Sequence, residues 1–284
     1  MITGYSKERL LVLYNPMVRR AVELAAEIRR FAGAGVPTLS VDDAAARDLV
    51  AAHDLVVALG GDGTMLRAGR LTAPHGGLVL GVNFGRLGFL PEVQPDDWRP
   101  ALERVLAGEG WAEARMMLRI EHLRSGTILS AEDALNEAVV GRGAQARMSR
   151  LLARINGDVL TTYVADGLIC ATPTGSTAYA LAAGGPILPP ENENILVVPI
   201  APHMSMERTI VLSGSATLEM EPEIDLEHQA GLSIDGQRET QLVRGDVVRA
   251  SRSPYVARFI RLRAPHYFFA TLVERLTNGR GSRT

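Results

Sequence analysis

The 284-residue sequence predicts an α/β domain, then a mainly antiparallel β domain, then one closing helix. Short apolar runs alternate with amphipathic helical patterns through residues 10–108, which indicates a parallel sheet with helices on its faces. After Trp111 the apolar segments are separated by turn dipeptides instead, which is typical of antiparallel strands. Residues 267–276 then carry a single helical pattern.

The N-terminal part is predicted to be Rossmann-like. Its buried strands are expected at residues 10–14, 38–41, 55–59 and 78–82. Helices are expected at residues 18–31, from Asp42-Asp43 to about 53, at 65–71 with Thr64 as the capping residue, and from Asp96-Asp97 to about 108. In such sheets ligands bind beyond the carboxyl ends of the strands.

The second part shows β-hairpin signals. Ser125-Gly126, Asn156-Gly157 and Asp235-Gly236 are dipeptides that favour tight turns. The expected strands are residues 117–123, 151–155, 159–164, 168–172, 209–212, 216–220, 232–234, 247–250 and 256–262. The expected division is therefore residues 1–111, residues 112–265, and residues 266–284 as a helix and tail that pack back on the N-terminal domain.

Composition limits the function classes. The formal charge of −2 gives no reason to expect binding to nucleic acid or to anionic membranes. No apolar run approaches the ~20 residues of a membrane helix, and the N-terminus lacks a secretory apolar region, so a cytoplasmic location is expected. Cys170 is the single cysteine, which excludes an intrachain disulfide and is interpreted as a small apolar residue in a strand.

A glycine-rich loop follows the apolar run at residues 55–59. Gly60, Gly61 and Gly63 surround Asp62, and Thr64 comes next, so bare backbone adjoins a helix start, an arrangement suited to phosphate. The Asp62 carboxylate would repel phosphate unless it binds a metal or accepts a proton. Lys7 is the one lysine, and no lysine-containing phosphate loop is present. Backbone amides, arginines and metal would therefore have to hold any phosphate.

Two polar clusters lie in the β part. Asn136-Glu137 stands at an expected strand start and could bind ribose hydroxyls or a base edge, or could be an exposed polar pair. The second cluster begins at Asp166 and continues through a strand and a turn into a helix of small residues expected at 176–183, capped by Ser176 or Thr177. Small side chains at a helix start would let a planar ligand lie against the backbone.

These motifs together resemble the NAD kinase family. The resemblance rests on Gly60-Gly61-Asp62-Gly63-Thr64, on Asn136-Glu137, and on Asp166-Gly167-Leu168 leading into Thr172-Pro173-Thr174-Gly175-Ser176-Thr177-Ala178-Tyr179. Supporting stretches are residues 80–89, 199–203 and 235–237, and the similarity spans about residues 10–275. The glycine–aspartate motif is shared with lipid kinases and phosphofructokinases, whereas the threonine-rich run together with Asn-Glu is specific.

The resemblance implies transfer of a phosphoryl group from ATP, or from polyphosphate, to the adenosine 2′-hydroxyl of NAD. Asp62 then matches the proton acceptor, although it could instead tighten the loop by accepting N–H groups. The phosphate loop would be Gly60, Gly61, Gly63 and Thr64. The substrate-binding positions would be Gly63, Arg67, Asn136, Glu137, Arg147, Asp166, Thr174, Thr177, Ala178, Tyr179, Ala182 and Gln237. Arg67, Arg147 and Gln237 also have a second interpretation as surface residues.

The same resemblance implies cofactors and partners. A divalent ion, Mg²⁺ by preference, is expected on the ATP phosphates without a dedicated protein site, and the partners are expected to be nucleotides and further copies of the chain, as a homodimer or homotetramer. Two alternatives stay open: a lipid or sugar kinase with the same glycine motif, and a non-catalytic dinucleotide sensor. Formation of NADP would distinguish them.

Overall fold

A computed structural model describes residues 5–85, 88–142, 148–203, 206–224, 230–237 and 239–278. The chain forms two compact units, residues 1–115 with 255–284 (unit 1) and residues 116–254 (unit 2). The divisions expected from the sequence lie after residues 111 and 265. The unit boundaries instead fall inside two long strands, β5 (Trp111–Arg124) and β16 (Asp246–Arg261). A strand that continues through a boundary leaves no turn or linker signal in the sequence.

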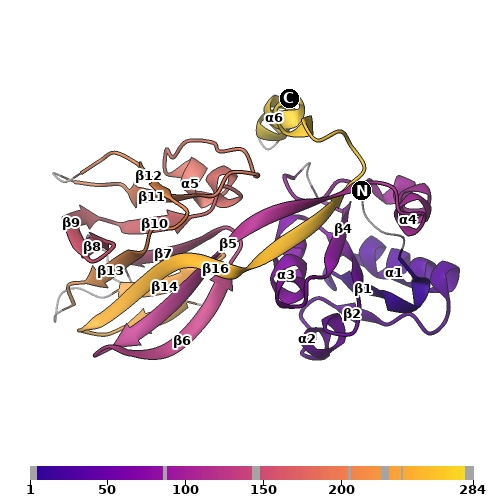
Figure 1. The fold of residues 1–284 in the computed structure, drawn as a ribbon, viewed down its shortest axis with the longest axis horizontal. Helices are drawn as coiled ribbons and strands as arrows, with labels where there is room; N and C mark the ends of the chain where they lie inside the picture. The colour runs from indigo at the N-terminus through magenta and orange to yellow at the C-terminus, as the bar shows by residue number, and fades with distance from the viewer. Residues whose placement is uncertain are drawn as a thin grey trace. The chain divides into compact units, whose positions relative to one another are not determined.

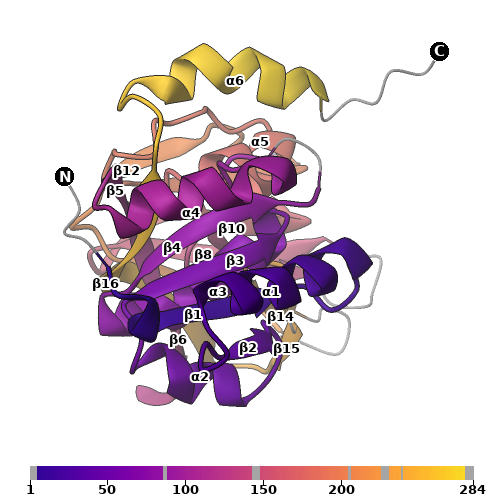
Figure 2. The ribbon, with the colours of Figure 1, turned by 90° about the vertical axis from the view of Figure 1, so that its right-hand side faces the viewer.

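Unit 1 is built on a parallel sheet in the order β2-β1-β3-β4-β16. The strands are β1 (Leu10–Tyr14), β2 (Thr38–Ser40), β3 (Leu55–Gly60) and β4 (Leu78–Asn83), joined by the C-terminal end of β16. The helices are α1 (Arg19–Ala32), α2 (Ala45–Val50), α3 (Asp62–Thr72) and α4 (Trp98–Leu106), with short 3₁₀ turns at Lys7–Arg9, Ala73–His75 and Pro95–Asp97. Helices α1 and α4 cover one face of this sheet and α3 the other (Figures 1 and 2).

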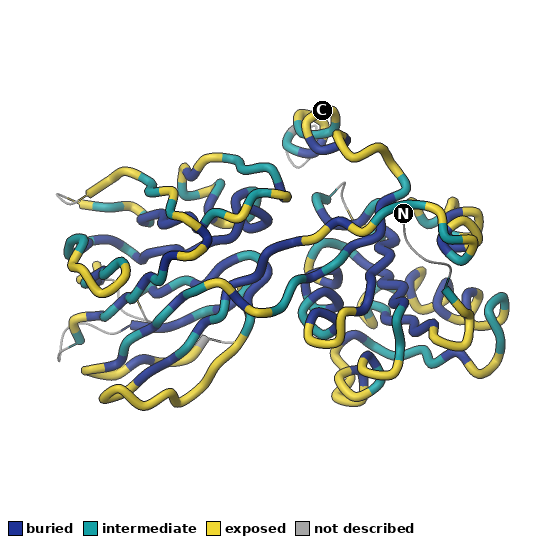
Figure 3. Tube along the Cα trace, in the orientation of Figure 1, coloured by how far each residue is buried: buried dark blue, intermediate teal, exposed yellow. Residues whose placement is uncertain are grey.

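The sheet of unit 1 is apolar on both faces because helices cover both. Every residue of β3 and β4 is buried, which Figure 3 shows as dark blue strands. Leu24 and Ile28 of α1 and Leu102 of α4 pack on one core with Leu55 and Leu80. The continuous apolar runs that predicted buried parallel strands therefore have the burial that such runs require.

Helix α3 begins three residues earlier than the sequence suggested. Its first residue is Asp62 and its capping position is Gly61, which makes no side-chain cap. The expectation that Thr64 caps the helix is wrong: Thr64 lies inside the first turn and is buried. A methyl group on Gly60 would lie 2.1 Å from the Thr64 hydroxyl oxygen, so glycine at position 60 gives Thr64 its room. The glycines let the chain turn directly from strand to helix, which places Asp62 at the helix start.

The C-terminal helix α6 (Tyr267–Asn278) contacts other residues of unit 1. The Tyr267 hydroxyl donates to the buried Glu113 carboxylate at 2.9 Å. Arg275 donates to the carbonyl of Phe89 at 3.1 Å, and the Phe268 ring packs against the Phe89 ring. The helix is thus tied to its unit by polar groups as well as by apolar contact.

Unit 2 consists of antiparallel strands in two sheets. One sheet has the order β12-β11-β10-β7-β14-β15, and the other includes β16-β13-β8-β9, with β5 paired to both β16 and β6. The further strands are β6 (Thr127–Ala134), β7 (Glu137–Arg142), β8 (Ser149–Ile155), β9 (Asp158–Ala165), β10 (Gly167–Ala171), β11 (Asn194–Ile200), β12 (Ile210–Ser213), β13 (Leu218–Pro222), β14 (Ala230–Ile234) and β15 (Glu239–Leu242). A 3₁₀ turn (Gly175–Thr177) and the short helix α5 (Tyr179–Ala182) follow β10.

The two faces of β10 have different neighbours. Leu168 and Cys170 belong to the main core of unit 2, whereas Ile169 and Ala171 pack with Ala180 of α5 on the opposite face. Cys170 is fully buried, as its interpretation as a small apolar strand residue requires, and burial raises the pKa of its thiol to about 12. The strand is therefore covered on both sides, and its carboxyl end leads directly into the threonine-rich turn.

The three hairpin dipeptides form tight turns. Both residues of Ser125-Gly126, Asn156-Gly157 and Asp235-Gly236 have positive φ, as a type I′ turn needs. The expected separate strands at residues 247–250 and 256–262 form the single strand β16. The predicted fold class, an α/β domain with a mostly parallel sheet followed by antiparallel β structure and a C-terminal helix, is confirmed. Within the described ranges, no helix is both long and apolar enough to cross a membrane.

Candidate functional site

In unit 1 the glycine loop lies at the carboxyl edge of the parallel sheet. Strand β3 ends at Gly60, and Asp62 is the first residue of α3. The two oxygens of Asp62 accept the backbone N–H groups of Phe89 and Leu90, at 3.1 and 3.0 Å. These two residues follow β4, which is the neighbour of β3 in the sheet. The segment after β4 therefore fixes the Asp62 side chain, which follows β3.

The approach of this segment to Asp62 depends on glycine. A methyl group on Gly88 would lie 2.3 Å from an Asp62 oxygen, which no carbon atom can do. Gly85 does not have this restriction, because a methyl group there would lie 3.6 Å from the Gly61 α-carbon, an ordinary van der Waals contact. Asp62 is half-buried and Gly63 is exposed, so the carboxylate and the bare backbone of the first helical turn stay within reach of a ligand.

Arg67 lies one turn further along α3. Its guanidinium forms an ion pair with Asp42, which follows β2. Both side chains are about half-exposed, so this pair contributes little to stability and can be exchanged for a ligand anion. The role of Arg67 in substrate binding stays a prediction.

In unit 2 the residues from Leu135 to Glu137 are fixed by a carboxylate far away in the sequence. Asp235, in the turn after β14, accepts the backbone N–H groups of Leu135, Asn136 and Glu137 at 2.9, 2.8 and 3.0 Å. From the other side, Thr172 donates its hydroxyl to the Leu135 carbonyl at 2.6 Å. The Asn-Glu pair therefore has a rigid backbone, while the Asn136 side chain is half-exposed.

The Glu137 side chain is in an unusual environment for a carboxyl group. It is 6% exposed, and one of its oxygens, Oε2, has no hydrogen-bond partner among the described residues. Burial and the nearby Asp235 raise the pKa of Glu137 to about 8, against a smaller opposite effect from the backbone N–H of Tyr179. At neutral pH this carboxyl group is mostly protonated and can both donate and accept a hydrogen bond.

The turn that follows β10 packs on the same strand start. A methyl group on Gly175 would lie 2.2 Å from the Asn136 carbonyl oxygen, so this close approach needs glycine. The expected single helix at residues 176–183 is wrong, because Ala178 adopts φ −105° and ψ −126°, which separates the 3₁₀ turn from α5. Ser176 does not cap a helix: its hydroxyl donates to the Pro173 carbonyl and accepts the Leu188 N–H.

The residues from Thr177 to Tyr179 are more exposed than those from Thr172 to Ser176. The Thr177 hydroxyl donates to the Thr174 carbonyl at 3.1 Å, and Thr174 itself is buried. Tyr179 and Ala182 are exposed and Ala178 is half-buried. The structure thus brings Asn136 and Glu137 together with the turn from Thr172 to Tyr179.

The remaining predicted positions of unit 2 lie in different settings. Asp166 sits between β9 and β10, half-buried, with Arg142 Nη1 3.6 Å from its carboxylate. Gln237 is exposed and follows the turn formed by Asp235 and Gly236. Arg147 lies outside the described residues.

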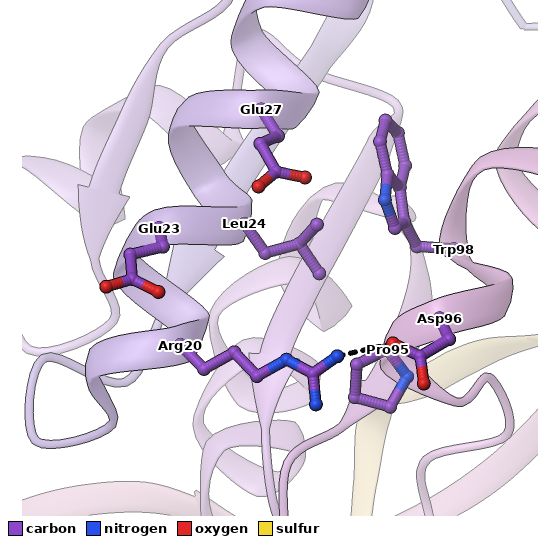
Figure 4. A pocket seen from close by; sticks show the side chains of 7 residues that line it. All are labelled: Arg20, Glu23, Leu24, Glu27, Pro95, Asp96 and Trp98. Carbon is purple, nitrogen blue, oxygen red and sulfur yellow. Dashed lines mark hydrogen bonds and ion pairs between the residues drawn. The ribbon is translucent and has the colours of Figure 1, made fainter.

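A separate pocket of about 270 Å³ in unit 1 contains none of these residues. It lies between α1 and the start of α4, and Figure 4 shows Glu23 and Glu27 on one side and Trp98 on the other. Arg20 and Asp96 form an ion pair across its edge. Because its acidic groups outnumber its one arginine, this pocket does not suit a phosphate. In the described part of the chain, no group of three or more His, Cys, Asp or Glu side chains is arranged to hold a metal ion.

Sequence reasoning missed three groups that the structure places at these sites. Asp235 was expected only as a turn residue in a supporting stretch, Phe89 only as the last residue of another such stretch, and Leu90 was not singled out. Arg142 supplies a positive charge beside Asp166 because β7 and β10 pair with Gly141 opposite Gly167. Backbone donors and cross-strand neighbours leave no motif, so only a strand-pairing prediction could have found them.

The fold and these two sites define a class: a protein with a glycine–aspartate loop on a Rossmann-like unit and a hydroxyl-rich, amide-lined site on a β unit, suited to nucleotides. Comparison with family models narrows the class. Residues 40–110 match the ATP-NAD kinase N-terminal domain and residues 135–262 match the ATP-NAD kinase C-terminal domain. The chain belongs to the NAD kinase family, which confirms the resemblance.

Relatives and solved structures agree with this assignment. An NAD kinase of Chloroflexus aurantiacus is 42% identical over 273 residues, covering 95% of this chain and 98% of that protein. An NAD kinase of Heliobacterium modesticaldum is 44% identical over 234 residues, covering 82% of each. A crystal structure of an NAD kinase from Archaeoglobus fulgidus in complex with ATP has a TM-score of 0.72 at 27% identity, covering 95% of this chain and 99% of that one. Yeast NADH kinase complexed with NADH shares the fold, with a TM-score of 0.81 at 23% identity and coverage of 97% and 89%.

Proposed function

We propose that Asp62 of this NAD kinase accepts the proton of the adenosine 2′-hydroxyl while that oxygen attacks the terminal phosphorus of ATP or polyphosphate. The observation that carries the proposal is the Asp62 carboxylate, held by two N–H groups at the start of α3 in a glycine loop. The new bond joins the 2′-oxygen to phosphorus, the bond from phosphorus to the donor's bridging oxygen breaks, and the proton passes to Asp62.

Unit 2 would hold the dinucleotide. Asn136 offers amide donors and an acceptor, and the mostly protonated Glu137 offers one of each, which suits ribose hydroxyls or a base edge. The turn from Thr174 to Tyr179 adds small side chains against which a planar base can lie. Asp166, Ala182 and Gln237 remain proposed contacts of the same dinucleotide, as does Arg147.

The donor phosphates would rest on the backbone of Gly60, Gly61, Gly63 and Thr64, near the positive end of α3. Arg67 would exchange Asp42 for a phosphate or for the substrate. A divalent ion, Mg²⁺ by preference, would arrive on the donor and neutralise its charge. We further propose a cytoplasmic location, which is where ATP and NAD are at hand, and assembly as a homodimer or homotetramer.

The decisive experiment incubates the protein with NAD and, in parallel, ATP or polyphosphate, and measures NADP by an enzymatic cycling assay. NADP formation with either donor supports the proposal and identifies the donor. Binding of NAD without NADP formation under both donors would favour a dinucleotide sensor, and phosphorylation of a lipid or sugar instead would favour the other kinases with this loop.

Asp62→Asn tests the role of the carboxylate itself. We expect the variant to fold and to bind NAD, and to lose about 10²–10⁴-fold in kcat, the usual contribution of a general base. Asp48→Asn, an exposed aspartate on α2, is the matched control and should keep full activity. An Asp62→Asn protein with unchanged kcat would remove Asp62 from the proposed role.

A further inference from the structure

The two residues whose N–H groups bind Asp62 also have carbonyl groups that accept hydrogen bonds from buried arginines. Arg275 bonds the Phe89–Leu90 peptide group, whose N–H donates to Asp62, and Arg261 bonds the next peptide group along the chain. Phe89 and Leu90 donate their N–H groups to Asp62. The carbonyl of Phe89 accepts a hydrogen bond from Arg275 Nη1 at 3.1 Å, and the carbonyl of Leu90 accepts one from Arg261 Nη1 at 2.6 Å. Each residue that holds the carboxylate is therefore fixed by a guanidinium, and all five residues belong to unit 1.

Arg261 is also part of the fold's own ion-pair network. Its side chain is 1% exposed, and its Nε and Nη2 donate to Glu113 at 2.8 and 2.6 Å. Arg115 donates to the same Glu113 oxygen. Removal of Arg261 would leave a buried carboxylate short of partners and endanger folding, so Arg261 cannot separate positioning from stability.

Arg275, on α6, has no comparable structural reason to be a buried arginine. It is 4% exposed, and its guanidinium lies over the rings of Phe89 and Tyr267 at 5.5 and 5.3 Å. Its Nε has no hydrogen-bond partner among the described residues. Burial lowers the pKa of Arg275. Tyr267 acts in the opposite direction, and the neighbouring Arg261, Arg263 and Arg115 lower the pKa further. The charge is thus kept at an energetic cost, and the contact that it makes is with the Phe89 carbonyl.

We propose that Arg275, supported by Arg261, is a positioning residue for phosphoryl transfer, which fixes the Phe89–Leu90 peptide group and through it the Asp62 carboxylate. This inference rests on the proposed role of Asp62 as proton acceptor. Helix α6, more than 200 residues after the glycine loop, then supports the reacting group without touching substrate. A loss of this support matters because a misplacement of about 1 Å can lower a rate about 100-fold.

The test compares kcat and KM in Arg275→Met, Arg275→Lys and the control Arg30→Met, an exposed arginine on α1 of the same unit. Methionine keeps an apolar stem but removes the donor, and we expect kcat to fall about tenfold with KM for NAD and for the phosphate donor within twofold. Lysine keeps the charge but not the planar guanidinium, and we expect a loss of about threefold in kcat. Arg30→Met should match the wild type.

A double-mutant cycle with Asp62→Asn separates positioning from a general structural defect. If Arg275 acts through the carboxylate, Arg275→Met should lower the residual rate of Asp62→Asn by less than twofold. A loss that persists at tenfold in the Asp62→Asn protein would overturn the proposal, as would a kcat within twofold of wild type in both Arg275 variants. Far-UV circular dichroism checks folding. If Arg275→Met does not fold, Arg275→Lys decides alone: its threefold loss should disappear in the Asp62→Asn protein, and a threefold loss that persists there, or a kcat equal to that of the wild type, would overturn the proposal.

The outcomes also separate this inference from the proposed function. Full activity of Asp62→Asn alone would refute the role of Asp62. An inactive Asp62→Asn protein beside fully active Arg275 variants would leave the proposed function standing and refute the positioning role.

Discussion

Two buried carboxyl groups of unit 2 have opposite environments. Asp246, at the start of β16, accepts hydrogen bonds from His122 at 2.8 Å, from Arg124 at 2.7 Å and from the Val243 N–H at 2.8 Å. Burial alone would raise the pKa of Asp246, but the Arg124, Val243 and His122 hydrogen bonds outweigh it and lower the pKa to about 2. Glu137, at the start of β7, is also buried, yet one of its oxygens lacks a partner among the described residues and its pKa is raised to about 8.

The difference teaches how a fold separates structural from binding carboxyl groups. Asp246 has its full set of partners built in, so it joins β5, β16 and the turn before β16 and offers nothing to a ligand. Glu137 is held through its backbone by Asp235 instead, while its side chain keeps an unused hydrogen-bonding capacity. A buried group left unsatisfied by the fold is a candidate for satisfaction by a substrate.

The largest effect in this comparison is expected from Asp246→Asn. The substitution leaves His122 and Arg124 without their anion, and we expect a loss of about 3 kcal/mol in the free energy of unfolding at pH 7. Because the folded-state pKa lies below the unfolded value of 3.8, the wild-type advantage is present above pH 4 and disappears as the pH falls towards 2. Urea unfolding followed by circular dichroism at several pH values measures it.

The control for that experiment is Asp158→Asn, an exposed aspartate in the hairpin between β8 and β9. It should leave the unfolding free energy within about 0.5 kcal/mol of wild type at every pH. If Asp246→Asn lowers the free energy of unfolding by the same amount at every pH, ionisation of Asp246 is not what stabilises its contacts with β5 and with the turn before β16.

Glu137→Gln should show the opposite pH dependence. The pKa of Glu137 is raised from 4.5 to about 8 in the folded protein, so the unfolded chain releases this proton first as the pH rises. The free energy of unfolding of the wild type therefore falls between pH 4.5 and 8 relative to that of Glu137→Gln, because the glutamine amide does not titrate. Between pH 4.5 and 8 we expect the difference in unfolding free energy between the wild type and Glu137→Gln to change by about 2 kcal/mol. Each unit of pKa corresponds to ~1.4 kcal/mol, and relaxation of the structure around the charged carboxylate reduces the full amount.

The same urea measurements check this prediction, with the exposed Glu191→Gln as control. A gap that is constant over this pH range, or that grows towards acid, would contradict the raised pKa and remove the contrast between the two carboxyl groups.

The smallest effect concerns ligand affinity. If protonated Glu137 binds the dinucleotide, then Glu137→Gln, which keeps a donor and an acceptor, should change KM for NAD by less than threefold at pH 7. Glu137→Ala removes both and should raise KM about tenfold, the loss of about one buried hydrogen bond. Steady-state kinetics at saturating donor measures both. Equal values of KM in the two variants would place Glu137 outside the binding site.

Much of the fold was readable because its signals are local. Continuous apolar runs predicted β3 and β4, and dipeptides such as Asn156-Gly157 predicted hairpins, since positive φ is a property of the turn residues themselves. The start of α3 and the break at Ala178 were missed. Both lie beside glycines that make room for a close contact, Gly60 for Thr64 within the same segment and Gly175 for Asn136 from another part of the chain.

By itself, the sequence determined the family, the order of the motifs, and the presence of Asp62, Asn136 and Glu137 at strand ends. The tertiary structure alone decided what these groups can do. Asp62 is aimed by backbone donors 27 and 28 residues away, and Glu137 is kept protonated by burial and by a carboxylate almost 100 residues away. Hydrogen-bond direction and proton affinity depend on which groups are near in space, and a one-dimensional pattern records only which are near in the chain.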